Sequence, residues 1–114
     1  MRTAVVILNW NGKGWLQQFL PGVIATSGDA LIVVADNGST DGSLGWLNAQ
    51  HPGVTTLDLG TNLGFAGGYN AALARVEADR YLLLNSDVRT TPGWLDALNA
   101  YMDRHPGIAA CQPK

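Results

Sequence analysis

The stretch TAVVILNWNG, residues 3–12, decides the fold that we predict for this chain. Its first part, Thr3 to Leu8, is almost continuously apolar and rich in β-branched side chains, which is typical of a strand covered on both faces. The run then breaks into the turn-like segment Asn9-Trp10-Asn11-Gly12. Similar apolar runs follow at residues 30–35, 54–59 and 81–84, so we expect four strands.

Segments with helical spacing lie between these runs. Trp15, Phe19, Leu20 and Val23 recur at three- and four-residue steps, and further helical segments are expected at residues 44–49 and 65–77. Pro92 suits the first turn of a fourth helix, which the Pro-Gly pair at 106–107 would stop. The alternation predicts an α/β, Rossmann-like domain with a mostly parallel sheet, strand order 3-2-1-4, and helices on both faces.

Composition excludes several classes of protein. The chain has 114 residues, 46% of them hydrophobic and 14% charged, which describes one soluble globular domain. The net charge of -2 offers no basic footprint for nucleic acid, and the single Cys111 cannot form an intrachain disulfide. The sequence shows no signal peptide and no apolar run of about 20 residues, the length needed to cross a bilayer. We therefore expect a cytoplasmic location.

Polar segments follow the predicted strands at the point where a parallel sheet binds ligands. In such sheets the ligand lies beyond the carboxyl ends of the strands, where the winding direction changes. Residues 9–12, 36–41 and 85–87 follow the first, second and fourth strands, and a glycine-rich segment at 60–70 opens the third helix. The segments at 9–14 and 60–70 fit neither Gly-x-Gly-x-x-Gly nor the P-loop pattern. Dinucleotide dehydrogenases and P-loop NTPases are therefore poor interpretations.

Asp36 ends the second strand and allows two interpretations. Its carboxylate could accept a hydrogen bond from the imide N–H of uracil or thymine, which cytosine lacks. Alternatively, it is a turn residue, because Asp, Asn, Gly and Ser are the residues that turns prefer. Asp41 or Thr40 is expected to cap the helix that follows.

Asp87, at the end of the fourth strand, is a candidate ligand of Mg²⁺ or Mn²⁺. Such an ion would take its other ligands from diphosphate oxygens and water, and it would assist the departing diphosphate. The alternative is a turn or capping Asp before Pro92. Trp10 is placed to stack on a base or ribose, whereas Trp15, Trp46 and Trp94 are expected in the core. Glycines 67 and 68 either admit a ligand or allow tight packing on the sheet.

Together, four segments resemble the N-terminal part of glycosyltransferase family 2, which has the GT-A fold. They are VVILNWNG (5–12), ADNGSTDGS (35–43), NLGFAGGYN (62–70) and LLNSDV (83–88). The resemblance covers the whole chain and is strongest to the rhamnosyltransferase-like branch associated with bacterial cell-surface polysaccharide.

The resemblance implies a binding site for a UDP- or dTDP-sugar. In the family's pattern Asp36 reads the base and Asn85-Ser86-Asp87 stands for the Asp-x-Asp metal motif, with Asp87 as the direct ligand of Mg²⁺ or Mn²⁺. Asn85 replaces the first acid, so metal affinity should fall. The residues that the resemblance assigns to the nucleotide are Asn9, Trp10, Asn11, Asp36, Asn62, Gly64, Asn70, Asn85 and Ser86.

The resemblance also predicts what this chain lacks. Residues 1–114 would be the nucleotide-sugar-binding part of a GT-A domain, cut off before the acceptor-binding part, with the start of a fifth strand at 107–112. The family's general base, a later Asp or Glu that permits inversion, has no counterpart here, so no catalytic residue is assigned and this fragment alone should be inactive. The parent enzyme would glycosylate a saccharide or lipid-linked acceptor and would be peripheral at the inner membrane face, and the uncovered sheet edge favours self-association.

Two other functions remain open from the sequence. The first is a non-catalytic nucleotide-binding module. The second is a nucleotidyltransferase, which would normally show a basic, glycine-rich loop after the first strand. Here that loop carries Lys13 as its only cation, so we rank this function last.

Overall fold

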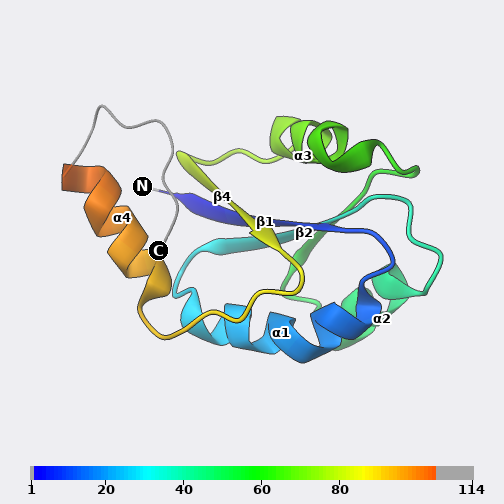
Figure 1. Cartoon of the computed structure of the whole chain (residues 1–114), viewed down its shortest axis with the longest axis horizontal. Coiled ribbons are helices and arrows are strands. Elements are labelled where there is room, and N and C mark those ends of the chain that lie inside the picture. The colour runs from blue at the N-terminus through cyan, green and yellow to red at the C-terminus, as the bar shows by residue number, and fades with distance from the viewer. Residues whose placement is uncertain (1, 105–114) are drawn as a thin grey trace.

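A computed structural model of the chain describes residues 2–104 and shows one parallel four-stranded sheet between helices (Figure 1). The strand order is β3-β2-β1-β4, which confirms the predicted order and class. The elements are β1 (Thr3–Asn9), α1 (Lys13–Thr26), β2 (Leu31–Asp36), α2 (Ser43–Gln50), β3 (Thr55–Asp58), α3 (Gly64–Ala74), β4 (Arg80–Asn85) and α4 (Trp94–Arg104).

Strand β1 is the centre of the molecule because both of its faces are covered. Val5 and Ile7 point into a core that includes side chains of α1, α2 and α4, and Ala4 and Val6 point into a second core under α3. All four side chains are at most 1% exposed. Burial on both faces therefore explains why residues 3–8 are almost continuously apolar. Figure 1 shows α3 on one face of the sheet and α1 and α2 on the other.

The first helix differs from its prediction in the side chains that it buries. The stripe that faces the sheet consists of Leu16, Leu20 and Val23, spaced by four and three residues. Trp15 is 51% exposed, so the expectation that it lies in the core is wrong. It stands one position from the stripe, about 100° around the helix, and therefore points away from the sheet. Trp46 and Trp94 do pack against the core, as predicted.

The ends of the later helices also differ from their predictions. Helix α3 ends at Ala74 instead of 77, because its last turn tightens: the N–H groups of Arg75 and Val76 donate to carbonyls three residues back. Helix α4 begins at Trp94, two residues after Pro92. The predicted fifth strand at 107–112 and the Pro-Gly stop at 106–107 lie outside the described residues.

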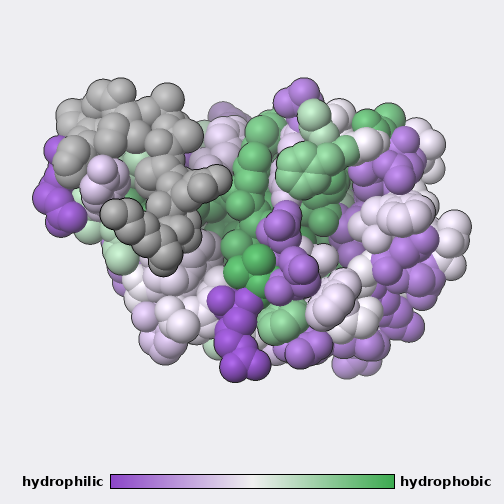
Figure 2. All heavy atoms as spheres, in the orientation of Figure 1, coloured by the Kyte–Doolittle hydropathy of each residue, from purple (hydrophilic) through white to green (hydrophobic). Residues whose placement is uncertain are grey.

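Strand β4 is an edge of the described sheet, and part of one of its faces is open. Leu82 and Leu84 pack against the core on the α1 side, whereas Tyr81 and Leu83 on the α3 side are exposed. Figure 2 shows a hydrophobic strip along the middle of the face that is turned toward the viewer. Helix α3 lies over β1 and β2, and its Tyr69 hydroxyl reaches across to donate to the carbonyl of Leu84 at 3.1 Å.

Gly68 allows α3 to approach the sheet closely. A Cβ atom at this position would lie 2.8 Å from a methyl carbon of Leu8 and 2.9 Å from Nδ2 of Asn37. The absence of a side chain is therefore required by packing, which supports the packing interpretation of this glycine. Gly67 is less crowded, with 3.3 Å to Leu63.

We predict that Gly68→Ala lowers the free energy of unfolding by about 1–3 kcal/mol, because the added methyl overpacks the contact between α3 and β1. The matched control is Gly22→Ala in α1, where a Cβ would meet nothing within 4 Å. That variant should gain up to about 1 kcal/mol from helix propensity. Urea unfolding measures both, and equal stability of the two variants would contradict the packing argument.

Candidate functional site

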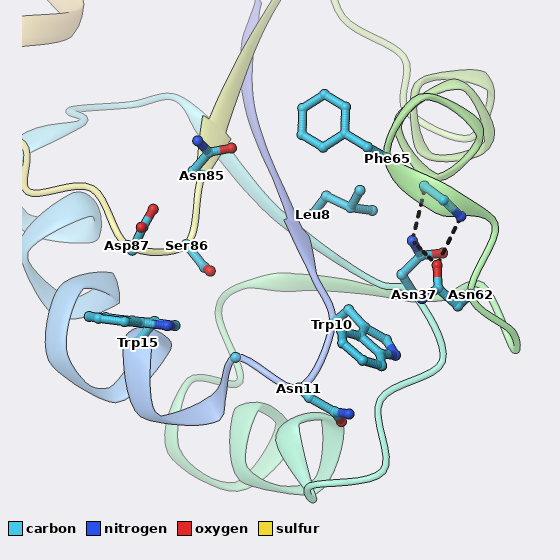
Figure 3. Close-up of a pocket in the computed structure, with 12 residues that line it drawn as sticks. Leu8, Trp10, Asn11, Trp15, Asn37, Asn62, Phe65, Asn85, Ser86 and Asp87 are labelled. Carbon is cyan, nitrogen blue, oxygen red and sulfur yellow. Dashed lines mark hydrogen bonds between the residues drawn. The ribbon is translucent and has the colours of Figure 1, made fainter.

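A pocket of about 540 Å³ lies at the carboxyl ends of the strands (Figure 3). This volume is in the usual range for small-molecule sites. Its wall comes from the end of β1 and the start of α1, the residue after β2, the loop that opens α3, and the segment after β4. The lining residues are Leu8, Trp10, Asn11, Gly12, Trp15, Asn37, Asn62, Gly64, Phe65, Asn85, Ser86 and Asp87.

Strand register explains why segments far apart in the sequence meet here. Asn9 pairs with Asp36 across β1 and β2, and Leu8 pairs with Asn85 across β1 and β4. The three strands therefore end at almost the same level, and parallel pairing brings their carboxyl ends to one rim. This confirms the expectation that the polar segments after the first, second and fourth strands gather at one edge.

Asp36 lies behind the pocket wall and does not line it. Its carboxylate is 1% exposed and accepts two internal hydrogen bonds, from Nδ2 of Asn9 at 3.0 Å and from the backbone N–H of Ser39 at 2.9 Å. Asn9 is also fully buried. These bonds correspond to the turn interpretation of Asp36. In this conformation neither residue reaches a bound base, although the sequence analysis placed both at the nucleotide.

Asn37 joins the end of β2 to the loop that opens α3. Its Oδ1 accepts from the N–H of Leu63 at 2.9 Å, and its Nδ2 donates to the Gly64 carbonyl at 3.0 Å and to Oδ1 of Asn62 at 3.2 Å. Asn62 in turn accepts from the N–H of Gly64 at 2.8 Å. Side chains therefore occupy the N–H groups of Leu63 and Gly64 at the start of α3.

The loop after β1 is bound to the loop after β2. Asn11 has a φ of 49°, a left-handed conformation that Asn tolerates better than most residues. Its N–H donates to Oγ of Ser39 at 2.8 Å, and its Oδ1 accepts from the N–H of Thr40 at 2.7 Å. These contacts fix the backbone directly after Trp10, which lines the pocket and is 56% exposed.

Asp41 connects the beginnings of two helices. Its carboxylate accepts from the N–H of Lys13 in α1 at 3.0 Å, and from the N–H at 3.0 Å and the hydroxyl of Ser43 in α2. Asp41 thus binds the first N–H group of each helix, as a capping side chain would, but the N-cap residue of α2 is Gly42, and Thr40 bonds to Asn11 instead. Burial acts to raise the pKa of Asp41, but the hydrogen bonds from Ser43 and Lys13 outweigh it, and the pKa is lowered from 3.8.

Seven of the ten predicted site residues line the pocket: Trp10, Asn11, Asn62, Gly64, Asn85, Ser86 and Asp87. Asn9 and Asp36 lie behind the wall. Asn70 is exposed on α3 and is not among the lining residues. The structure adds Leu8, Gly12, Trp15, Asn37 and Phe65. Of these, Leu8, Gly12, Asn37 and Phe65 lay inside the motifs that carry the resemblance. Trp15 lay outside them, and its position beside the buried stripe was the signal that could have found it.

The lining is polar but nearly uncharged. Four asparagines and one serine contribute, and Asp87 is the only ionisable side chain among the described lining residues. Within residues 2–104 no group of three His, Cys, Asp or Glu side chains comes together. A metal ion here would therefore need ligands from the bound molecule as well as from the protein.

Comparisons with known proteins agree with this geometry. The sequence pattern described as Glycosyl transferase family 2 matches residues 4–114. An N-acetylglucosaminyl-diphospho-decaprenol L-rhamnosyltransferase of Mycobacterium tuberculosis is 31% identical over 96% of this chain, and an uncharacterized glycosyltransferase of Nostoc sp. is 32% identical over 76% of it. The chain spans 39% and 28% of the length of these relatives.

Solved structures share the fold. TarS 1-349 of S. aureus in complex with UDP-GlcNAc superposes with a TM-score of 0.79 at 23% identity, covering 93% of this chain and 32% of that one. The mannosyltransferase PcManGT of Pyrobaculum calidifontis, in complex with GDP-Man and Mn²⁺, gives 0.72 at 21% identity, covering 85% and 30%. At these identities the likeness establishes the GT-A type of fold alone.

We predict that Asp41→Asn lowers the free energy of unfolding by about 1 kcal/mol at pH 7, because the amide keeps one acceptor oxygen but puts a donor NH₂ in place of the oxygen that accepts from Lys13. Because the pKa of Asp41 is lower in the folded chain than its ordinary value of 3.8, this stabilisation is present above pH 3.8 and is lost as the pH falls through the folded pKa. The difference from the wild type should shrink below pH 3.8 in urea unfolding. Asp29→Asn, in an exposed turn, is the control, and a difference that stays constant with pH would contradict the assignment.

Proposed function

The chain belongs to glycosyl transferase family 2, and we propose that it is the donor-binding part of a sugar transferase that takes a UDP- or dTDP-linked sugar with Mg²⁺ or Mn²⁺. The observation that carries this proposal is the convergence of the polar ends of β1, β2 and β4 on one pocket. A nucleotide sugar is long enough to contact all three ends at once, and ligands in such sheets bind at this edge.

One end of the pocket suits a nucleoside. Trp10 and Phe65 present exposed aromatic rings there, and Asn62 contributes an amide. Rings provide stacking surface, while an amide can both donate and accept hydrogen bonds. The preference for uracil or thymine rests on the family resemblance, because Asp36 would have to exchange its bonds to Asn9 and Ser39 before it could contact a base.

The other end suits a diphosphate that brings a cation with it. No Lys, Arg or His is present among the described lining residues, so these residues cannot offset the charge of a diphosphate. Asp87 and the amide oxygen of Asn85 are oxygen donors of the kind that Mg²⁺ and Mn²⁺ accept, and Mg²⁺ commonly binds through one or two carboxylates plus phosphates. The ion, when bound, stabilises negative charge on the departing diphosphate. Asn85 in place of an acid should weaken its binding.

The remaining parts of the reaction fall to the rest of the protein in this proposal. The lining that residues 2–104 contribute holds no second carboxylate that could deprotonate an acceptor hydroxyl, and the chain spans only 39% of its rhamnosyltransferase relative. We place an inverting general base and the acceptor site in that remainder. The relative's name specifies a lipid-linked sugar, which favours a saccharide or lipid-linked acceptor for the parent enzyme.

Location and assembly are also proposals. Among residues 2–104 no helix is long and apolar enough to pass through a bilayer. A cytoplasmic enzyme that works at the inner membrane face is compatible with this finding and with a lipid-linked acceptor. We also propose self-association through β4, because Tyr81 and Leu83 are exposed along that edge strand.

We predict that UDP and dTDP bind the chain in isothermal titration and that Mn²⁺ tightens both. Asp87→Ala should abolish the metal-dependent part, a loss of about tenfold or more, since even outer-shell partners of metals are worth that much. The nucleoside contacts are unaffected, so binding without metal should persist.

CDP and GDP complete the panel, and Asp29→Ala is the matched control because Asp29 is an exposed acid outside the pocket lining. Equal affinity for all four nucleotides would remove the preference for uracil and thymine. Mn²⁺ dependence that survives in Asp87→Ala would remove Asp87 from the metal site, and no binding of any nucleotide would overturn the proposed function.

A further inference from the structure

Three large aromatic side chains line the pocket while remaining more than half exposed. Trp10 is 56%, Trp15 51% and Phe65 69% exposed, and among the other large apolar side chains of residues 2–104 only Leu83 is more than half exposed. Exposed aromatic surface that is concentrated around one pocket is a signature of ligand binding. In Figure 3, Phe65 and Trp10 lie toward the loop that opens α3, whereas Trp15 lies on the side of Ser86 and Asp87.

Trp15 is held in place by a contact outside the core. The buried stripe of α1 leaves its indole pointing away from the sheet, where it stacks on Phe19 with ring centroids 6.1 Å apart and planes at 16°. This contact restricts the ring while leaving half of its surface exposed. Beside it, Gly14 has no side chain, and a Cβ there would meet nothing within 4 Å, so the approach to this end of α1 is open.

A second glycine brings the start of α1 close to the end of β4. A Cβ on Gly12 would lie 3.3 Å from Oγ of Ser86 and 2.6 Å from Oδ1 of Asn9. A side chain at this position would clash with Asn9 and crowd the hydroxyl of Ser86. The first turn of α1, which carries Trp15, therefore borders the same end of the pocket as Ser86 and Asp87.

The order of the groups along a nucleotide sugar indicates which group would contact the indole of Trp15. If the nucleoside binds at Trp10 and the diphosphate beside Asp87, as the proposed function has it, the next group along the ligand is the sugar. We propose that Trp15 is the platform on which the pyranose ring of the donor packs. One face of a pyranose carries C–H groups, and these pack favourably on an indole, whose face bears partial negative charge. This inference rests on the proposed function and adds a residue that distinguishes a sugar nucleotide from a free nucleotide.

The test compares each sugar nucleotide with its own diphosphate on the same protein. UDP-GlcNAc against UDP, and dTDP-rhamnose against dTDP, are titrated with Mn²⁺ into the wild type, Trp15→Ala and Trp15→Phe. For Trp15→Ala we expect the ratio of the Kd of the sugar nucleotide to that of the diphosphate to rise by about tenfold, which is the worth of one aromatic contact. UDP and dTDP themselves should bind as before, and Trp15→Phe should recover most of the ratio.

Trp10→Ala is the matched control because Trp10 lines the nucleoside end of the pocket. It should weaken the sugar nucleotide and the diphosphate equally and leave the ratio unchanged. An unchanged ratio in Trp15→Ala would overturn the platform. So would an equal loss for UDP and UDP-GlcNAc, since Trp15 would then serve the nucleotide or only the fold. If the wild type binds none of the four ligands, the proposed function is wrong, and the role proposed for Trp15 is wrong with it.

Discussion

The parallel pairing of β1 with both β2 and β4 is the constraint on which the rest of the structure depends. Because all strands run in one direction, every loop that leaves a carboxyl end must start from the same rim, and the register sets these starts at nearly one level. Pairing also forces β1 into the centre, where its Ala and Val side chains must fit under α3 and its Val and Ile side chains under α1. The pocket is thus a consequence of strand direction, before any particular ligand is considered.

Hydrogen bonds from side chains, more than apolar contacts, shape the rim itself. Asn37 and Asp41 accept from backbone N–H groups of neighbouring segments, those of Leu63 and Lys13, and Asp36 accepts from Nδ2 of Asn9 at the end of β1, so the motif after β2 organises the segments on both sides of it. This use of short polar side chains is typical of turns, where they satisfy backbone groups that no strand or helix can reach. It also leaves the pocket with amide and hydroxyl surface and with a single acid.

The sequence predicted the architecture well because its signals were long and redundant. The apolar runs of β1 and β2, the order of the strands and the meeting of the polar segments were all confirmed. The individual site residues were less predictable, because periodicity does not say which of two adjacent side chains faces the core, as with Trp15 and Leu16. Motif position likewise does not distinguish a residue that contacts a ligand from one that supports the wall, which is the case for Asp36.

The hydrogen bonds that hold the side chain of Asn37 also affect how readily this residue deamidates. Asn followed by Gly is the dipeptide most prone to deamidation, because the backbone nitrogen of the glycine can attack the side-chain amide with little obstruction. Here the amide of Asn37 is 3% exposed and engaged in three hydrogen bonds. Such engagement opposes the rotation that the attack requires. Should the loop open and the amide hydrolyse, the new carboxylate would face the oxygens of Asn62 and Gly64, and the loop could not close again as before. The rate at which Asn37 deamidates in the folded protein therefore depends on how often this loop opens.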